Sequence, residues 1–291
     1  MKTGFVERNL RFIFPAPALA FVLVMMVFPV LYTLGLSFTN WNLTSGMPLK
    51  FVGLRSFARI LAEPRFLDAL WRTLLLTFGS VAIETVLGLI LALALNRDFF
   101  GKGFLKLVLL LPLVATPVAI GIVWNLFYDP TIGLANFALS LAGLPRSDWV
   151  YGAATVLPSL MIVDVWQWTP MITLVVLSGL AGLSSEPYES ARVDGADEWQ
   201  IFWGITLPMV MPTVLTAMIL RTVDALKTFD IIYAMTGGGP GYASETLNVM
   251  AFKYSFEYFR MGQASVLLVI LFAVVLGSSV GIMKLRSRVE I

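Results

Sequence analysis

Six long runs of apolar residues are the feature that most constrains the fold of this chain. A helix needs about 20 mostly apolar residues to cross the hydrocarbon core of a membrane. Inside lipid only helices and closed barrels satisfy all backbone hydrogen bonds, and these runs are too long for barrel strands. The sequence therefore predicts an all-α membrane protein with six transmembrane helices, at 12–38, 74–95, 104–127, 156–180, 202–226 and 264–283.

The composition agrees with a membrane protein and excludes several functions. Of the 291 residues, 58% are hydrophobic and 13% charged, far from the balance of soluble domains. There is no Cys and no His, which removes zinc sites, thiolate nucleophiles and imidazole bases. The net charge of +2, without a long basic run, gives no basis for nucleic-acid binding. We expect one transmembrane domain over residues 1–291.

The first apolar run has two interpretations. A secretory signal has an apolar region of about 7–15 residues before its cleavage site, and Ala18-Leu19-Ala20 offers suitable small residues. The run at 12–38 is much longer than that. We therefore favour an uncleaved first transmembrane helix over a cleaved signal.

Basic residues in the short loops predict the orientation, because Lys and Arg concentrate on the cytoplasmic side. Three such groups fall on one side of a six-helix arrangement, which places both termini in the cytoplasm: Lys2, Arg8 and Arg11; Arg97, Lys102 and Lys106; and Lys284, Arg286 and Arg288. Four basic residues in the first outer loop argue against this, with less weight because that loop is longer: Lys50, Arg55, Arg59 and Arg65.

A polar segment, "ESARVDGADEWQIFWGITLP" from Glu189 to Pro208, interrupts the apolar chain between the fourth and fifth runs. Glu186 and Pro187 suit the first turn of a helix, with Ser185 as its N-cap. Gly195 is unfavourable inside a helix and predicts a turn between two short helices. From the residues alone, the segment is either a solvated cytoplasmic loop or a docking surface.

The spacing in this segment resembles a known signature. Glu189-Ser190-Ala191, three residues, Gly195, nine residues and Ile205-Thr206-Leu207-Pro208 are similar to the EAA motif of permeases of ATP-binding-cassette importers, with Ser190 the one departure. The resemblance implies a type I importer bundle in which segment 184–204 is a coupling helix that docks on a cytoplasmic ATPase. It implies that Glu189 pairs with a basic residue of that ATPase. The implied coupling residues are Glu189, Ser190, Ala191, Asp194, Gly195, Ala196, Leu207 and Pro208.

Further stretches resemble the sugar-importer branch of these permeases. They are "SGLAGLSSEPYESARVDGA", "LRTVDALKTFDIIYAMTGGGPGYASETL" and "FPVLYTLGLSFTNW", and they are similar to the first-subunit type of maltose-like systems. The resemblance implies a second permease subunit, an ATPase dimer, an extracytoplasmic solute-binding protein and a sugar as substrate. It also implies a bacterial or archaeal inner membrane. The chain has no G-x-x-x-x-G-K-[ST] motif, so we expect ATP and Mg²⁺ to bind the partner ATPase and no cofactor or metal to bind here.

Ionisable residues inside membrane spans are functional candidates because they are expensive to bury in lipid. Asp164, Gln167, Trp168 and Met171 share one face of the fourth helix. Carboxylate, amide and indole groups suit a sugar's hydroxyls and its C–H face, so we predict that Asp164, Gln167 and Trp168 line the substrate pathway. The alternative is an interfacial Trp belt with one helix-packing Asp.

Three other groups carry similar alternatives. Arg221, Asp224 and Thr228 on the fifth helix are predicted pathway residues. The alternative is a charge-pair scaffold near the outer end, in which Arg221 pairs with Asp224 and Asp224 with Lys227 at i, i+3 spacing. Trp124, Asn125 and Tyr128 are pathway residues or an interfacial belt with Asp129. Glu84 makes a helix–helix hydrogen bond or belongs to a proton relay.

Prolines predict which helices line the pathway, because broken helices face cavities rather than lipid. Pro112 and Pro117 are expected to break the third helix, and Pro208 and Pro212 the fifth. The third, fourth and fifth helices are therefore the predicted pathway helices.

The prediction is one permease subunit of an ATP-driven sugar importer. Three alternatives stay open. The first is an importer of another solute, and the sugar-branch stretches argue against it. A secondary transporter predicts an internal repeat, which we do not find. An intramembrane enzyme using Asp164 and Glu84 would have to work without His or Cys.

Overall fold

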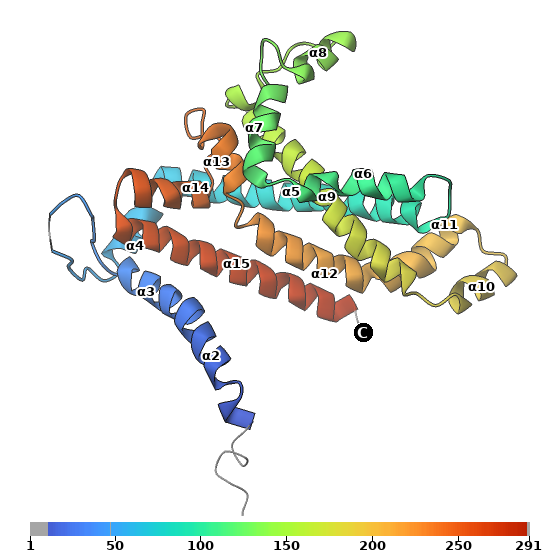
Figure 1. Cartoon of the computed structure of the whole chain (residues 1–291), viewed down its shortest axis with the longest axis horizontal. Helices are drawn as coiled ribbons and strands as arrows, with labels where there is room; N and C mark the ends of the chain where they lie inside the picture. The colour runs from blue at the N-terminus through green and yellow to red at the C-terminus, as the bar shows by residue number, and fades with distance from the viewer. Residues whose placement is uncertain (1–10, 47, 290–291) are drawn as a thin grey trace, which may run out of the picture. The chain divides into compact units, whose positions relative to one another are not determined.

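The fold is described from a computed structural model, which covers residues 11–46 and 48–289. Within these ranges the chain is helical, and the sole β contact is an isolated bridge between Thr39 and Phe51 (Figure 1). The helices, in chain order, are α2 Ala16–Val22, η1 Leu23–Val27, α3 Phe28–Ser37, α4 Arg55–Leu61, α5 Pro64–Asn96, α6 Lys102–Val114, α7 Pro117–Phe127, α8 Leu134–Leu141, η2 Trp149–Tyr151, α9 Val156–Ala181, α10 Glu186–Val193, α11 Glu198–Ile201, η3 Phe202–Thr206, α12 Leu207–Ala225, α13 Asp230–Thr236, α14 Leu247–Phe252, η4 Lys253–Glu257 and α15 Met261–Val289.

Five of the six predicted spans are long helices in the structure, and the third predicted span corresponds to a bent pair of helices. The described residues hold spans at Arg11–Ser37, Pro64–Asn96, Val156–Ala181, Glu198–Ala225 and Met261–Lys284, together with the pair Lys102–Val114 and Pro117–Phe127. The all-α prediction is confirmed. The second helix begins at Pro64, ten residues before the predicted start at 74. The prediction missed its first turns because they mix polar and apolar residues, and a search for continuous apolar runs does not detect them.

The third run is not one continuous helix but two helices that meet at 101°. Thr116 precedes Pro117 and has an extended backbone, with ψ 142°, as the clash with a following proline ring favours. Pro117 then starts α7, where its missing N–H costs nothing. Pro112 lies inside α6 and does not end it, so the break comes from Pro117 alone.

The fifth run corrects a prediction. Pro208 lies in the first turn of α12 and Pro212 lies inside it, and neither ends the helix. The irregularity is upstream, in the π-helical turn η3. A π turn leaves backbone carbonyls with altered partners, which accommodates Pro208 without a break.

The chain divides into two compact units, Met1–Phe66 with Ala251–Ile270, and Leu67–Met250 with Leu271–Ile291. The prediction of one domain over 1–291 stays a prediction. In the first unit, the loop after α3 is joined to the start of α15 by backbone hydrogen bonds from Gly262 N to Trp41 O (3.0 Å) and from Leu43 N to Phe259 O (3.0 Å).

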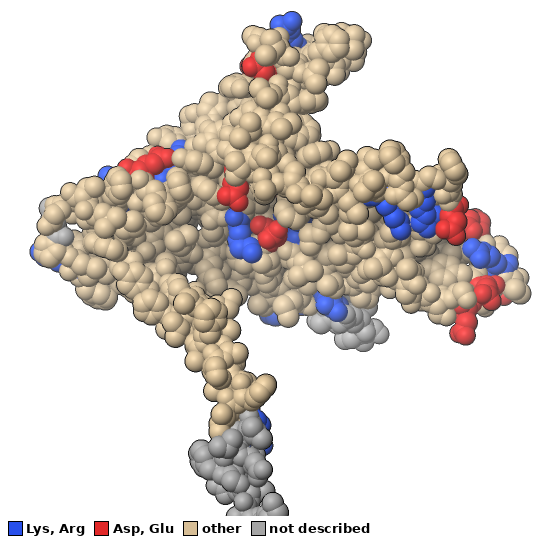
Figure 2. All heavy atoms as spheres, viewed as in Figure 1, with Lys and Arg blue, Asp and Glu red and all other residues tan. Residues whose placement is uncertain are grey.

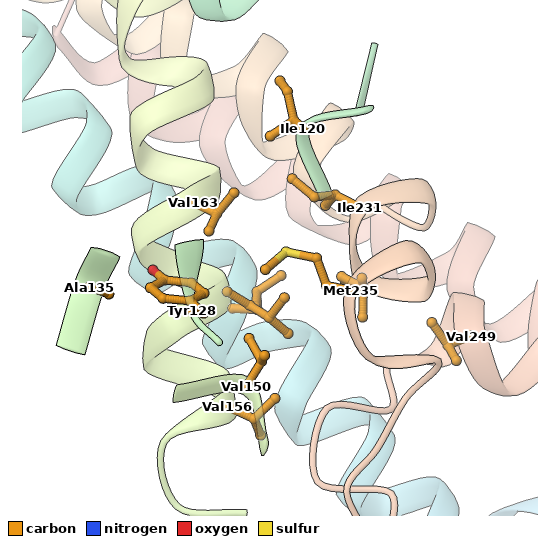
Figure 3. Close-up of a cluster of buried hydrophobic side chains, with 12 residues drawn as sticks. Ile120, Tyr128, Ala135, Val150, Val156, Val163, Ile231, Met235 and Val249 are labelled. Carbon is orange, nitrogen blue, oxygen red and sulfur yellow. The ribbon is translucent and has the colours of Figure 1, made fainter. Parts of the chain in front are cut away.

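The second unit has two hydrophobic clusters. One joins α7, α9 and α13 and is shown in Figure 3, where Tyr128, Val163, Ile231 and Met235 converge. The other joins α5, α9 and α12. Glycine permits this close helix packing: a Cβ on Gly88 would lie 2.7 Å from Ile172 Cγ2, and one on Gly179 would lie 2.7 Å from Thr213 Cγ2.

Candidate functional site

The polar segment folds as two short helices joined by a turn, as predicted. Helix α10 begins at Glu186 after Ser185, but the Ser185 side chain makes no capping hydrogen bond. Gly195 has φ +82°, in the left-handed region that glycine adopts without steric cost. Gly195 N donates to Arg192 O (3.2 Å) and Ala196 N donates to Ala191 O (2.9 Å). This pair of bonds is the Schellman motif of a helix C-terminus.

The second short helix, α11, starts at a cap that the sequence prediction missed. Asp197 accepts a hydrogen bond from Gln200 N (2.8 Å), and Asp197 N donates to Gln200 Oε1 (2.9 Å). This reciprocal pair is a capping box, and the spacing of Asp and Gln three residues apart is its sequence signal. The turn around Gly195 is therefore fixed from both sides by hydrogen bonds within the segment.

The segment presents both charge and apolar surface. Among the residues of α10 none is buried, and Val193 is 88% exposed. Trp199 and Trp203 are exposed as well and contact each other edge to face. Figure 2 shows acidic and basic side chains gathered where α10 and α11 lie. A cavity of about 710 Å³ opens beside them, lined by Asn96, Arg97, Tyr188, Glu189, Arg192 and Trp199, among others.

The predicted coupling residues lie together on this segment. Ala191 and Ala196 are half-buried beside the turn, while Glu189, Ser190, Asp194 and Gly195 are exposed. Leu207 is half-buried and Pro208 is exposed at the start of α12. Their role in coupling stays a prediction. The segment that carries them is an exposed pair of short helices, held in place by its own hydrogen bonds.

A buried ionic cluster joins three membrane-spanning helices. Arg221 of α12 donates from Nε to Glu84 Oε2 (2.8 Å) and from Nη2 to Glu84 Oε1 (3.1 Å). The same Nη2 donates to Asp164 Oδ2 of α9 (2.5 Å). Arg221 and Glu84 are fully buried and Asp164 nearly so. Trp168 places its ring 5.0 Å from the Arg221 guanidinium carbon, a cation–π contact.

This arrangement corrects one prediction and resolves another. Arg221 does not pair with Asp224 and does not reach the helix end, because two carboxylates hold it inside the protein. Asp224 instead pairs with Lys227 at 3.7 Å, with both side chains exposed. Glu84 makes the helix–helix hydrogen bond that one of its two interpretations predicted. Sequence periodicity could not reveal this pairing, because the partners are 137 and 57 residues apart.

The other predicted pathway residues form two further groups. Asn125 donates to Met235 O (3.0 Å), Tyr128 donates to Ser159 O (3.2 Å), and Trp124 contacts Trp166. These contacts tie α7 to α13 and α9. Asp224 is exposed and Thr228 half-buried just beyond α12. Gln167 is buried beside Asp164 on α9. Contact of any of these residues with substrate stays a prediction.

The comparisons with known proteins agree with this geometry. Residues 56–287 match the family described as binding-protein-dependent transport system inner membrane component. The chain belongs to this family. It is therefore a multi-pass membrane permease of a binding-protein-dependent transport system, and the predicted permease resemblance is confirmed.

Individual relatives cover nearly the whole permease. The chain is 36% identical to the trehalose/maltose transport system permease protein MalF of Thermococcus litoralis, over 97% of this chain and 95% of that protein. It is 33% identical to the trehalose transport system permease protein SugA of Mycobacterium tuberculosis, over 92% and 86%. A crystal structure of a bacterial alginate transporter has a similar fold, with TM-score 0.83, 20% identity and coverage of 98% and 96%.

Proposed function

We propose that this permease forms half of the translocation pathway of an ATP-driven importer whose substrate is a sugar or sugar derivative. Support for the substrate class comes from relatives named for trehalose, maltose and multiple sugars. The sugar-branch stretches in the sequence point the same way. Polar side chains of the predicted pathway helices, such as Asp164 and Gln167, would bind the hydroxyl groups of the sugar.

The observation that carries the coupling part of this proposal is the rigid α10–Gly195–α11 projection. It is fixed by its own hydrogen bonds and leaves Val193 88% exposed. An exposed apolar residue within a charged segment suits a protein interface, whose centre is apolar and whose rim is polar. A separate ATPase pair would dock here and hydrolyse ATP, and Glu189 would meet a basic residue of that partner.

Transport would follow from a shift between two states. ATP favours closure of the ATPase pair, and closure favours one arrangement of the permease helices over the other. The segment lies between α9 and α12, which Asp164 and Arg221 join. Movement of the docked segment would therefore move both helices together. A second permease subunit would complete the pathway, and a binding protein outside would deliver the sugar. Both termini would lie in the cytoplasm.

The test is uptake by the complete complex in proteoliposomes, with its binding protein outside and ATP inside. Trehalose, maltose, a polyol, methionine and phosphate are offered separately as labelled substrates. The proposal predicts ATP-dependent accumulation of one or more of the carbohydrates. Accumulation of methionine or phosphate without any carbohydrate would show an importer of the same architecture with another substrate class, and would overturn the sugar assignment.

A further inference from the structure

Basic residues gather in the first unit in a way that the transport function does not explain. Segments 38–66 and 251–263 carry Lys50, Arg55, Arg59, Arg65, Lys253 and Arg260 against Glu63 and Glu257. In loops on the outer side, where the orientation predicted above places these segments, basic residues are disfavoured.

Three of these arginines line one pocket of about 440 Å³. Its other polar lining residues are Asn40, Asn42, Ser45, Ser56 and Gln263, with Trp41 beside them. No Asp or Glu lines the pocket, and in the described part of the chain no carboxylate pairs with Arg55, Arg59 or Arg260. The guanidinium groups therefore present free donors to one volume.

Both asparagine carbonyls that line the pocket are already used. Asn40 Oδ1 accepts from Lys50 N (2.9 Å), and Asn42 Oδ1 accepts from Thr44 N (2.9 Å), so the carbonyl oxygens of both amides are occupied. Ser56 donates its one hydroxyl proton to Thr39 O (3.1 Å) and keeps its oxygen as an acceptor. A pocket lined by three arginines and by no carboxylate suits an oxyanion, because arginine binds carboxylate and phosphate through paired hydrogen bonds.

The pocket is built on a fixed backbone. Asn40 N donates to Lys50 O (3.1 Å), and Gly262 N donates to Trp41 O (3.0 Å). A Cβ on Gly262 would lie 3.2 Å from Trp41 N and closer still to Thr39 O, so only glycine allows this approach. The loop bearing Asn40 and Trp41 is thereby held against the segment bearing Arg260 and Gln263.

Two observations place the pocket at the membrane boundary. Asn40 and Trp41 follow the span that ends at Ser37, and Arg260 directly precedes the span that begins at Met261. Chain neighbours of the lining residues are apolar and exposed, with Phe51 77% and Leu54 68% accessible. Basic groups beside exposed apolar side chains are typical of a protein surface that sits in the headgroup region of a bilayer.

We propose that this pocket binds the phosphate of an anionic phospholipid headgroup through Arg55, Arg59 and Arg260. The exposed apolar side chains beside it contact the acyl chains, and Trp41 lies at the level of the headgroups, where this residue type is enriched. The inference does not depend on which substrate is transported.

Native mass spectrometry of the delipidated complex tests the proposal, with dioleoyl phosphatidylglycerol, dioleoyl phosphatidylcholine or inorganic phosphate added in separate titrations. Each basic residue in contact with the anionic headgroup should strengthen binding roughly fivefold. We expect phosphatidylglycerol to bind more tightly than phosphatidylcholine. Arg59→Gln should weaken it roughly fivefold, and the triple variant with Arg55→Gln and Arg260→Gln roughly a hundredfold.

The control is Lys50→Gln, which removes one exposed charge of the same unit from outside the pocket lining. It should bind phosphatidylglycerol much as the wild type does. Equal binding by the wild type and the single Arg59→Gln variant, or no preference for phosphatidylglycerol in the wild type, would overturn the proposal. Saturable binding of inorganic phosphate that displaces no lipid would assign the pocket to a free anion and overturn it as well.

Discussion

Arg221 and Asp164 meet across the contact between α12 and α9, with Nη2 2.5 Å from Oδ2. Glu84 of α5 holds the other edge of the same guanidinium. One buried cation thus joins three helices. Because α9 and α12 flank the α10–α11 segment, this ion cluster positions the helices that would carry motion from that segment.

Replacing Arg221 tests how far the cluster depends on its cation. Arg221→Met leaves two buried carboxylates without a counter-charge, and removing one partner of a buried ion pair costs about 3–5 kcal/mol. We expect a marked fall in the unfolding temperature of the detergent-purified complex. Lys227→Met breaks an exposed pair and should cost under about 1 kcal/mol. Equal stability of the two variants would contradict the structural role given to Arg221.

Two substitutions of Gly195 distinguish a role in the backbone turn from a role in docking. Its φ of +82° disfavours Ala by about 1–2 kcal/mol, whereas Asn tolerates this region. A Cβ there meets no atom of this chain within 4 Å, so any obstruction would come from a partner. We expect both Gly195→Ala and Gly195→Asn to lower binding-protein-stimulated ATP hydrolysis. If Gly195→Asn is as active as the wild type while Gly195→Ala is not, the glycine serves the turn and not close approach.

Local signals predicted more of this protein than long-range ones did. The span positions, the break at Pro117 and the turn at Gly195 follow from runs of residues and from the conformations that Pro and Gly allow. Two predictions were wrong: the pairing of Arg221 with Asp224, and the helix breaks at Pro208 and Pro212. Both considered only the residues next to each position in the sequence. The partners that decide Arg221 lie 57 and 137 residues away, and no periodic pattern encodes them.

The Tyr254–Glu63 pair predicts an alkaline limit of stability. Tyr254 donates its hydroxyl to both Glu63 oxygens, at 2.9 and 2.8 Å, and a bond to a charged group contributes about 1.5–3 kcal/mol. Burial first, and then the hydrogen bond to Glu63, raise the pKa of Tyr254 above its ordinary value. A raised tyrosine pKa means that this stability is fully present below the ordinary value of about 10 and is lost above it.

We therefore expect Tyr254→Phe to lower the unfolding temperature by the same amount from neutral pH to about pH 10, with the difference shrinking at higher pH. Tyr258→Phe is the matched control, because Tyr258 contacts Tyr254 through its ring. It should change stability little. A Tyr254→Phe variant as stable as the wild type at neutral pH would show that the bond contributes nothing.

The absence of cysteine from the sequence allows a clean test of orientation. Phe100→Cys lies in the exposed connection between α5 and α6, and Ile132→Cys lies in the exposed loop before α8. With both termini in the cytoplasm, a membrane-impermeant maleimide should label Phe100→Cys in inside-out vesicles and Ile132→Cys in right-side-out vesicles. Labelling of both positions from one side would contradict the six-span topology.

The central claim, that the α10–α11 projection transmits ATP hydrolysis to the permease, is tested most directly at Val193. The reconstituted complex is assayed for binding-protein-stimulated ATP hydrolysis with Val193→Asp and with Ile132→Asp, which makes the same chemical change at a similarly exposed residue elsewhere. Burying a carboxylate at an interface centre costs enough to predict a loss of roughly tenfold or more, or release of the ATPase, for Val193→Asp. Ile132→Asp should keep both activity and assembly. Wild-type hydrolysis and full retention of the ATPase by Val193→Asp would contradict the account.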